Sequence, residues 1–252
     1  MTTGDAMPPR PARIALAWRW AEMTLLYVVF PGLLAAAVDK QARWHGPMRS
    51  WRLGWLVDAA MSPGRLVFPV LLATTAVIVL CLLLDPSFDK SRLWGWRRAR
   101  NEMPRILAWW CWAAIGLLGA AALLAFGTGT LPEAAFLRLP REHPGLMVLI
   151  WVLYPWLSAY PQEITHRVFF WHRYACLFPD RWSLLVVNAL LFAWMHAMFW
   201  NWVALVMTFV GGLLFAMTYD RTRSGLAAGV EHGLYGAWCF TTGLGWFVFV
   251  GR

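Results

Sequence analysis

Three short segments place ionisable side chains inside or beside stretches that are apolar enough to lie in lipid. They are PQEITHR (161–167), FAWMHAMFWN (192–201) and GVEHGLYG (229–236). Such side chains are costly in hydrocarbon, so they usually face a bundle interior or a water-filled cavity. A carboxylate and two imidazoles from different helices can hold and deprotonate a water molecule, with glutamate as the base and imidazole stabilising the developing oxyanion. These residue types therefore indicate hydrolysis inside the bilayer.

The first segment carries the candidate base. Glu163 and Arg167 are four residues apart with the acid first, which is the order that favours an ion pair along a helix. Gln162 and His166 have the same spacing on the neighbouring face. Pro161 suits the first turn of a helix, so we expect a new helix to begin there. Taken alone, the Glu163–Arg167 pair is equally well explained as an ordinary salt bridge at a helix start.

The second and third segments supply the imidazoles. His196 lies in an apolar helix with Asn201 just beyond it. A lone histidine within a membrane helix is more often a packing or interhelical hydrogen-bonding residue than a catalytic one. Glu231 and His232 interrupt a helix rich in Gly and Ala, where helices pack closely. Two adjacent ionisable residues at such a position favour a site, and Glu231 is a second candidate carboxylate.

The composition indicates which elements must position these residues. Of 252 residues, 60% are hydrophobic and only 14% are charged, whereas soluble domains carry about 25% charged residues. Several apolar runs reach roughly the 18 residues that a membrane-spanning helix needs. We therefore expect an all-α, polytopic transmembrane bundle of about seven or eight helices, forming a single integral membrane domain over residues 1–252. The predicted spans are about Leu16–Val38, Leu66–Leu84, Ile106–Phe126, Pro144–Tyr160, Ser183–Met198, Trp202–Tyr219 and Leu226–Thr242, with a short last piece, Leu244–Val250.

The segments between these spans are polar or basic. We expect a short N-terminal tail (1–14), a Trp-rich loop (39–64) and an amphipathic interfacial segment (89–105). The net charge of +9 is concentrated in such connectors, as in membrane proteins whose Lys and Arg set the orientation. No aromatic-basic recognition module accompanies the charge, so nucleic acid is not an expected partner. The charge distribution favours a cytoplasmic N-terminus, and the four cysteines show no CxxC spacing.

With these motifs the sequence resembles the CAAX prenyl protease and bacteriocin-processing (CPBP) family of glutamic-type intramembrane endopeptidases. Members carry EExxxR, FxxxH and HxxxN on separate helices of a bundle of about eight. The chain has Gln162-Glu163-xxx-Arg167, Phe192-xxx-His196 and His232-xxx-Gly236 in the same order. The resemblance covers roughly residues 145–250, which would form the catalytic core.

The resemblance implies metal-free hydrolysis of a peptide bond, without a cofactor, in a substrate that lies in or near the bilayer. By position, it matches Glu163, Arg167, His196 and His232 to residues of the family motifs. We expect catalytic roles for Glu163, His196 and His232, with Gln162, Arg167, Glu231 and Asn201 as supporting residues. We expect the chain to lie in a bacterial inner membrane. Two departures stand out: Gln162 replaces the first Glu, which usually has the base role, and Gly236 replaces Asn. Glu163 would then be both the base and the partner of Arg167, and a carboxylate paired with a guanidinium is a weaker base.

Other readings remain open at this stage. HExxH and GxSxG are absent from the sequence, and its aspartates lie in connectors, which disfavours three other intramembrane protease chemistries. One Glu and two His can also bind zinc. A non-catalytic membrane protein with an immunity, binding or chaperone role is the main alternative, because Gln162 cannot accept a proton. A transporter that uses these charges as a proton relay is less favoured, since no repeated halves are seen.

Overall fold

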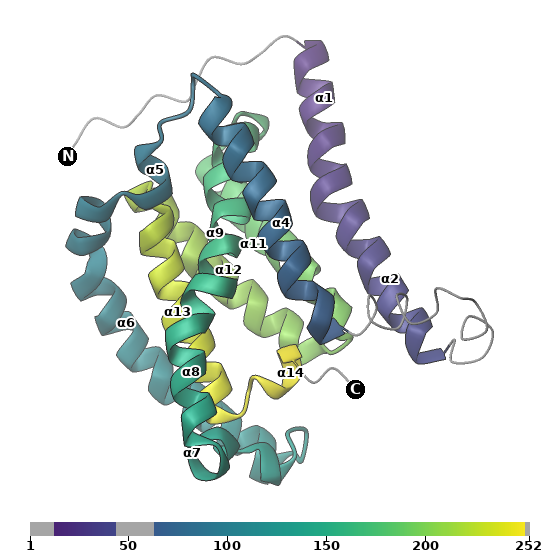
Figure 1. Ribbon diagram of the computed structural model, residues 1–252, viewed down its shortest axis with the longest axis vertical. Helices are drawn as coiled ribbons and strands as arrows, with labels where there is room; N and C mark the ends of the chain where they lie inside the picture. Colours follow the sequence, from purple (N-terminus) through teal and green to yellow (C-terminus); the bar gives the residue numbers. More distant parts are fainter. Residues whose placement is uncertain (1–12, 44–62, 250–252) are drawn as a thin grey trace.

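The structure is a computed structural model that describes residues 13–43 and 63–249, and the chain is helical in these residues with no strand (Figure 1). This confirms the predicted all-α class. Labels with η denote 3₁₀ and π segments. The elements in chain order are α1 (Arg13–Thr24), η1 (Leu25–Val29), α2 (Phe30–Arg43), α4 (Pro63–Leu84), α5 (Ser91–Trp94), α6 (Trp96–Ala122), η3 (Leu123–Gly127), η4 (Glu133–Ala135), α7 (Arg138–Glu142), α8 (Pro144–Tyr154), η5 (Pro155–Ala159), α9 (Tyr160–Glu163), η6 (Ile164–Phe169), α10 (Phe170–Tyr174), η7 (Ala175–Leu177), α11 (Arg181–Met195), η8 (His196–Phe199), α12 (Trp202–Thr222), α13 (Gly225–Thr242) and α14 (Trp246–Phe249).

Several of these helices have the character of membrane spans. By length and composition, three stretches of the described residues can cross a bilayer: Ser91–Gly127, Arg181–Phe199 and Trp202–Thr222. Pro69–Leu84 is a shorter apolar helix. The segment predicted to lie at the interface, residues 89–105, forms α5 and the first turns of α6 instead of a separate element. The predicted N-terminal tail and Trp-rich loop lie largely outside the described residues.

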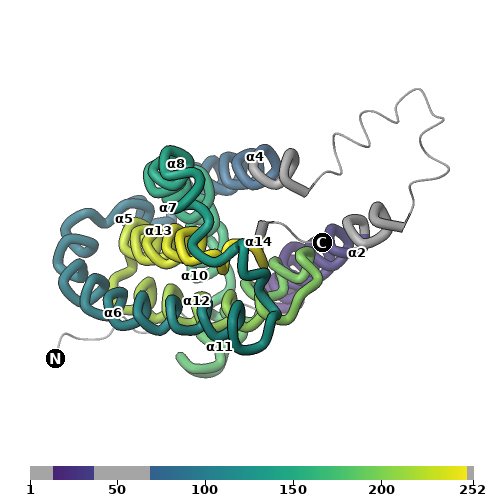
Figure 2. Tube along the Cα trace, turned by 90° about the horizontal axis from the view of Figure 1, so that it is seen from below, coloured from purple at the N-terminus to yellow at the C-terminus, as the bar shows by residue number. Residues whose placement is uncertain are grey.

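Helix α13 lies at the centre of the bundle, between α6, α12 and the run from α8 to α9 (Figures 1 and 2). Small residues on one face of α13 allow this close approach. A Cβ added to Gly229 would lie 2.8 Å from the Tyr160 ring, and one added to Gly233 would lie 2.9 Å from the Pro155 side chain. The glycines thus bring the face of α13 that carries His232 against the helix that carries Glu163.

The helix expected to begin at Pro161 does not begin there, and this prediction was wrong. Residues Pro144 to Tyr174 form one continuous helical run that passes through both Pro155 and Pro161. The π-helical segment η5 begins at Pro155, and a second one, η6, follows Pro161. At the end of η5 the Tyr160 N–H donates a hydrogen bond to the Pro155 carbonyl, five residues earlier and not four as in an α-helix. A proline lacks an N–H, and such local π adjustments re-satisfy the freed backbone groups within membrane helices.

Charged pairs gather at one end of the bundle. They join the end of α1, the end of α4, the start of α6, the α10–α11 connection and the end of α12. The pairs are Glu22–Arg173, Asp85–His172, Glu102–Arg221 and Arg181–Asp220. These ion pairs bring basic connectors that are far apart in the sequence next to one another.

Candidate active site

The first and third predicted segments meet at one hydrogen bond. Nδ1 of His232 on α13 lies 2.9 Å from Oε1 of Glu163 at the end of α9, and both side chains are buried. A carboxylate accepts hydrogen bonds and an imidazole N–H donates them, so Nδ1 of His232 carries the proton. In a neutral His232, Nε2 is then the free acceptor. The imidazole is also held by its stacking on Phe215, with ring centroids 4.6 Å apart.

Arg167 closes the other side of the Glu163 carboxylate. Its Nε is in ion contact with Glu163 Oε2 at 3.2 Å, so the ion pair expected from the i, i+4 spacing is present. Its Nη2 donates a hydrogen bond to the Gly212 carbonyl of α12, and the guanidinium lies over the Phe192 ring. Glu163 and Arg167 both have 0% of their surface exposed. The carboxylate is therefore enclosed between a guanidinium and an imidazole.

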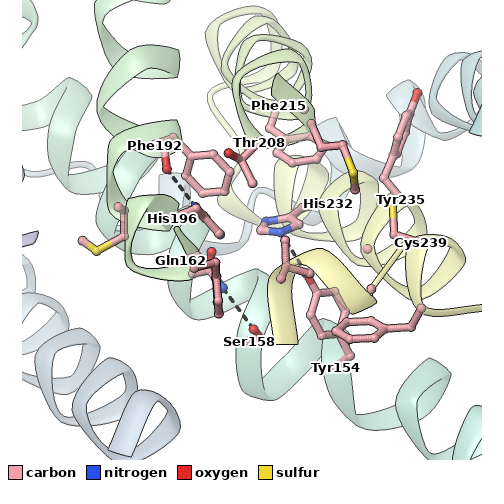
Figure 3. Close-up of a pocket in the computed structure, with 18 of the residues that line it drawn as sticks. Tyr154, Ser158, Gln162, Phe192, His196, Thr208, Phe215, His232, Tyr235 and Cys239 are labelled. Carbon is pink, nitrogen blue, oxygen red and sulfur yellow. Dashed lines mark hydrogen bonds between the residues drawn. The ribbon is translucent and has the colours of Figure 1, made fainter. Parts of the chain in front are cut away.

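His196 approaches the same region from the end of α11, where it begins η8. Its Nδ1 lies 2.8 Å from the Phe192 carbonyl, which only accepts, so Nδ1 carries the proton and Nε2 is free in the neutral ring. His196 and His232 both line one large cavity of about 1320 Å³ (Figure 3). The Phe192 ring contacts both imidazoles, with centroids 4.8 Å from His196 and 5.6 Å from His232. The structure thus presents two imidazole acceptors to one space.

The cavity distinguishes between the two neighbouring residues Gln162 and Glu163. Gln162 lines it and donates a hydrogen bond to the Ser158 hydroxyl at 3.0 Å (Figure 3). Glu163 does not line it, and none of the described residues that do is an aspartate or a glutamate. Direct contact between Glu163 and a water molecule in the cavity would require the carboxylate to move. As the structure stands, Glu163 reaches the cavity only through His232.

The structure does not bring Glu231 to this cavity. Consecutive residues of an α-helix point about 100° apart, and Glu231 faces away from the side that carries His232. It lines a separate small pocket with Arg105, Thr218 and Arg221, between α6 and α12. The second candidate carboxylate therefore belongs to the charged end of the bundle.

Asn201 also lies outside the cavity lining, and its side chain makes structural hydrogen bonds. Its side-chain oxygen accepts a hydrogen bond from the Ala204 N–H at 2.7 Å, which caps the N-terminus of α12. Its amide donates to the Phe247 carbonyl of α14, also at 2.7 Å. Asn201 thus joins two helices, and its hydrogen bonds in the described residues go to Phe199, Phe247 and Ala204 and not to a histidine.

We expect Asn201→Ala to lower stability and to leave the chemistry of the cavity intact. Loss of an N-cap costs about 1 kcal/mol, and the Phe247 carbonyl also loses its donor. The free energy of unfolding in detergent micelles measures the effect, with Asp180→Ala, which removes the cap of α11, as the comparison. A variant as stable as the wild type but with impaired cleavage would return Asn201 to the site.

Two residues of the site were not among the predicted ones. The Tyr154 hydroxyl of α8 lies 3.1 Å from Nε2 of His232. His166 lines the cavity, with Nδ1 near the Gln162 carbonyl at 3.1 Å and its ring edge-to-face with Phe192. His166 has the i, i+4 relation to Gln162 that the sequence displays. Tyr154 gives no such signal, because it reaches His232 across 78 positions of the chain.

A metal site has a further requirement. Catalytic zinc sites use three protein ligands and keep a fourth position open. Within residues 13–43 and 63–249, no group of three or more His, Cys, Asp and Glu side chains is placed to hold a metal ion. His196 and His232 would therefore need another ligand before they could bind zinc in this way.

Comparison with known proteins gives a family match for part of the chain. Residues 144–238 match the family described as Type II CAAX prenyl endopeptidase Rce1-like. This match spans less than half of the chain and contains Gln162, Glu163, Arg167, His196 and His232. Neither the curated proteins nor the solved structures give a match. The resemblance read from the three motifs is confirmed over the matched residues.

Proposed function

From the match of residues 144–238 to the family described as Type II CAAX prenyl endopeptidase Rce1-like, we propose that the chain is an intramembrane endopeptidase whose base is His232, oriented by Glu163. The Glu163–His232 hydrogen bond of 2.9 Å carries this proposal. A buried carboxylate that accepts from Nδ1 fixes the tautomer in which Nε2 can take a proton, and it stabilises the imidazolium that forms. Glu163 thus keeps a catalytic role although it is enclosed.

The hydrolytic step can be written with these groups. A water molecule in the cavity adds its oxygen to the carbonyl carbon of the scissile bond, and its proton passes to Nε2 of His232. The π electrons of the carbonyl move to its oxygen, which becomes an oxyanion. The carbonyl then re-forms as the C–N bond breaks, and Nε2 returns the proton to the leaving nitrogen. The second O–H of the water molecule donates a hydrogen bond to Nε2 of His196. This hydrogen bond orients the lone pair of the water oxygen toward the carbonyl carbon.

The remaining residues position this pair. Arg167 remains protonated and serves to neutralise the buried charge of Glu163. Its guanidinium also holds the Gly212 carbonyl of α12 and the Phe192 ring, so α9, α11 and α12 share one anchor. Gln162 faces the cavity as a neutral hydrogen-bonding group. We assign it to orienting the substrate or the water.

The cavity favours a substrate that arrives from the bilayer. Its lining is mostly apolar and includes substantially exposed residues of three different helices, such as Phe30 of α2, Leu149 of α8 and Val206 of α12. A cavity bounded by such residues opens sideways, toward lipid. A membrane-embedded or membrane-proximal protein or peptide is therefore the proposed partner.

The proposal is tested with the full chain reconstituted in phospholipid vesicles. The first probe is an internally quenched peptide with a farnesylated cysteine followed by three residues, and an unprenylated peptide of the same sequence is its control. The second is a bacterial membrane fraction whose new N-termini are read by mass spectrometry. We expect cleavage by the wild type at defined bonds, with one oxygen atom from labelled water in each new carboxylate. Failure to generate new termini in both probes would overturn the proposal.

One observation favours a second function. Gln162 faces the cavity where the family has its first Glu, and no carboxylate lines the cavity in the described residues. A non-catalytic binding or chaperone protein would show this arrangement. Gln162→Glu separates the two functions, because it places a carboxylate in the cavity next to His196 and His232. Cleavage that appears only in this variant favours the non-catalytic function, whereas cleavage already present in the wild type favours the protease.

The same features lead to a proposal for the membrane and the orientation of the chain. We propose that residues 145–250 form the catalytic core of a single membrane domain and that the membrane is a bacterial inner membrane. The charged end of the bundle, which carries Arg173, Arg181 and Arg221, would then face the cytoplasm together with the N-terminus. Protease accessibility of tags at the two ends of α12 in oriented vesicles tests this orientation.

A further inference from the structure

The Tyr154 hydroxyl lies next to Nε2 of His232, the ring nitrogen that does not bond Glu163. It lies 3.1 Å from Nε2, and both residues line the cavity (Figure 3). Because Nδ1 of His232 donates to Glu163, Nε2 of the neutral ring is an acceptor and the phenol is the donor. Tyr154 belongs to none of the three motifs. Its O–H is therefore a hydrogen-bond donor placed in the cavity by the fold alone.

The position of the phenol depends on Gly236. His232 and Gly236 are four residues apart and share one face of α13. A Cβ at position 236 would overlap the ring and the hydroxyl of Tyr154, closer than real Cβ atoms approach other groups. The space in which a side chain at position 236 would project is thus filled by Tyr154. The Phe240 ring, 5.5 Å away and edge-to-face, holds the phenol from the next turn of the helix.

We propose that Tyr154 is a catalytic residue that donates a hydrogen bond to the oxyanion, from the place that Gly236 leaves open. This inference rests on the proposed hydrolytic function. Nε2 of His232 and the Tyr154 hydroxyl are one hydrogen bond apart, so a tetrahedral carbon beside them can present the attacking oxygen to Nε2 and the oxyanion to the phenol. The neutral O–H is suited to this role because it donates without adding a charge to an apolar cavity.

The arrangement also explains how the resting site becomes active. In the absence of substrate, the phenol donates to Nε2 and occupies the lone pair of the base. An entering carbonyl offers the phenol a second acceptor next to the first. Transfer of the phenol hydrogen bond to the substrate frees Nε2 for water, so binding of the carbonyl and release of the base occur together.

Tyr154→Phe is the first test, because it removes one oxygen and keeps the ring. Loss of one oxyanion donor typically lowers kcat about 10²-fold or more, so we expect a fall of this size with KM changed less than about threefold. Tyr219→Phe is the matched control, since the Tyr219 hydroxyl is buried, lies outside the cavity lining and has no hydrogen-bond partner in the described residues. If the wild type cleaves and Tyr154→Phe has the same kcat, the inference about Tyr154 is overturned while the proposed function stands.

A pair of variants tests whether Gly236 and Tyr154 share one space. Gly236→Asn by itself should displace the phenol and lower kcat. Gly236→Asn combined with Tyr154→Ala places an amide donor in the vacated volume, so we expect a kcat at least tenfold above that of Tyr154→Ala. A combined variant no more active than Tyr154→Ala would contradict the shared position.

A spectroscopic measurement tests the contact without cleavage. In protein with ¹⁵N-labelled histidine, the Nε2 resonance of His232, identified by its loss in His232→Gln, should shift in Tyr154→Phe and stay unchanged in Tyr219→Phe. An unshifted resonance in Tyr154→Phe would overturn the inference. Absence of cleavage by the wild type would instead overturn the proposed function and, with it, the role of the phenol in that reaction.

Discussion

His232→Ala is expected to abolish cleavage while the chain remains folded and inserted. Removal of a base that acts as one unit with its carboxylate lowers kcat by roughly 10⁴-fold or more, and only binding and oxyanion contacts remain. His196→Ala should also be strongly impaired. The double variant should lose little more than His232→Ala alone, because members of a catalytic unit are non-additive.

The measurement is single-turnover cleavage of the farnesylated peptide by equal amounts of folded protein in vesicles. His143→Ala is a suitable control, because this histidine is exposed just before α8 and is not among the residues that line the cavity. Cleavage by His232→Ala at more than a tenth of the wild-type rate would remove His232 as the base. Additive losses in the double variant would separate His196 from His232.

Glu163→Gln is expected to affect both stability and activity. The change leaves the fully buried guanidinium of Arg167 without its carboxylate partner, and breaking a buried pair from one side costs about 3–5 kcal/mol. An amide at this position can also donate to Nδ1 of His232 and fix the wrong tautomer, so kcat should fall about 10³-fold or more in the folded fraction.

A second substitution separates the two effects. Arg167→Met in the Glu163→Gln background removes the unpaired charge and should recover most of the lost free energy of unfolding, measured in mixed micelles. Cleavage should stay lost, since nothing restores the carboxylate behind His232. A double variant with wild-type stability and wild-type kcat would show that Glu163 is needed neither by the fold nor by the reaction.

Sequence alone determined the features that depend on local spacing and on composition. The shortage of charge and the long apolar runs determined the all-helical membrane class, because only helices satisfy every backbone group within lipid over such lengths. The Glu163–Arg167 ion pair followed from i, i+4 geometry, which holds in any helix. The order of the three motifs also pointed to one site formed by separate helices.

Two expectations failed or stayed open for reasons that are not local. The sequence places a helix start at Pro161, but the structure continues the helix through π-helical turns. Neighbouring helices and these turns re-satisfy the backbone groups that proline frees, and the sequence gives no sign of such help. Gln162 and Glu163 are adjacent, so their side chains point about 100° apart. Which of them faces the cavity depends on how this helix is rotated against α13.

The contacts of His232 were decided by tertiary structure alone. Its partners Glu163 and Tyr154 are 69 and 78 positions away, and no local rule connects them. They meet because glycines on α13 let its backbone approach the run from Tyr154 to Tyr160 closely, and because Gly236 leaves room for the Tyr154 ring. Sequence determined which residue types the site contains. Only the packing of the helices decided that the glutamate lies behind the imidazole and that a phenol lies in front of it.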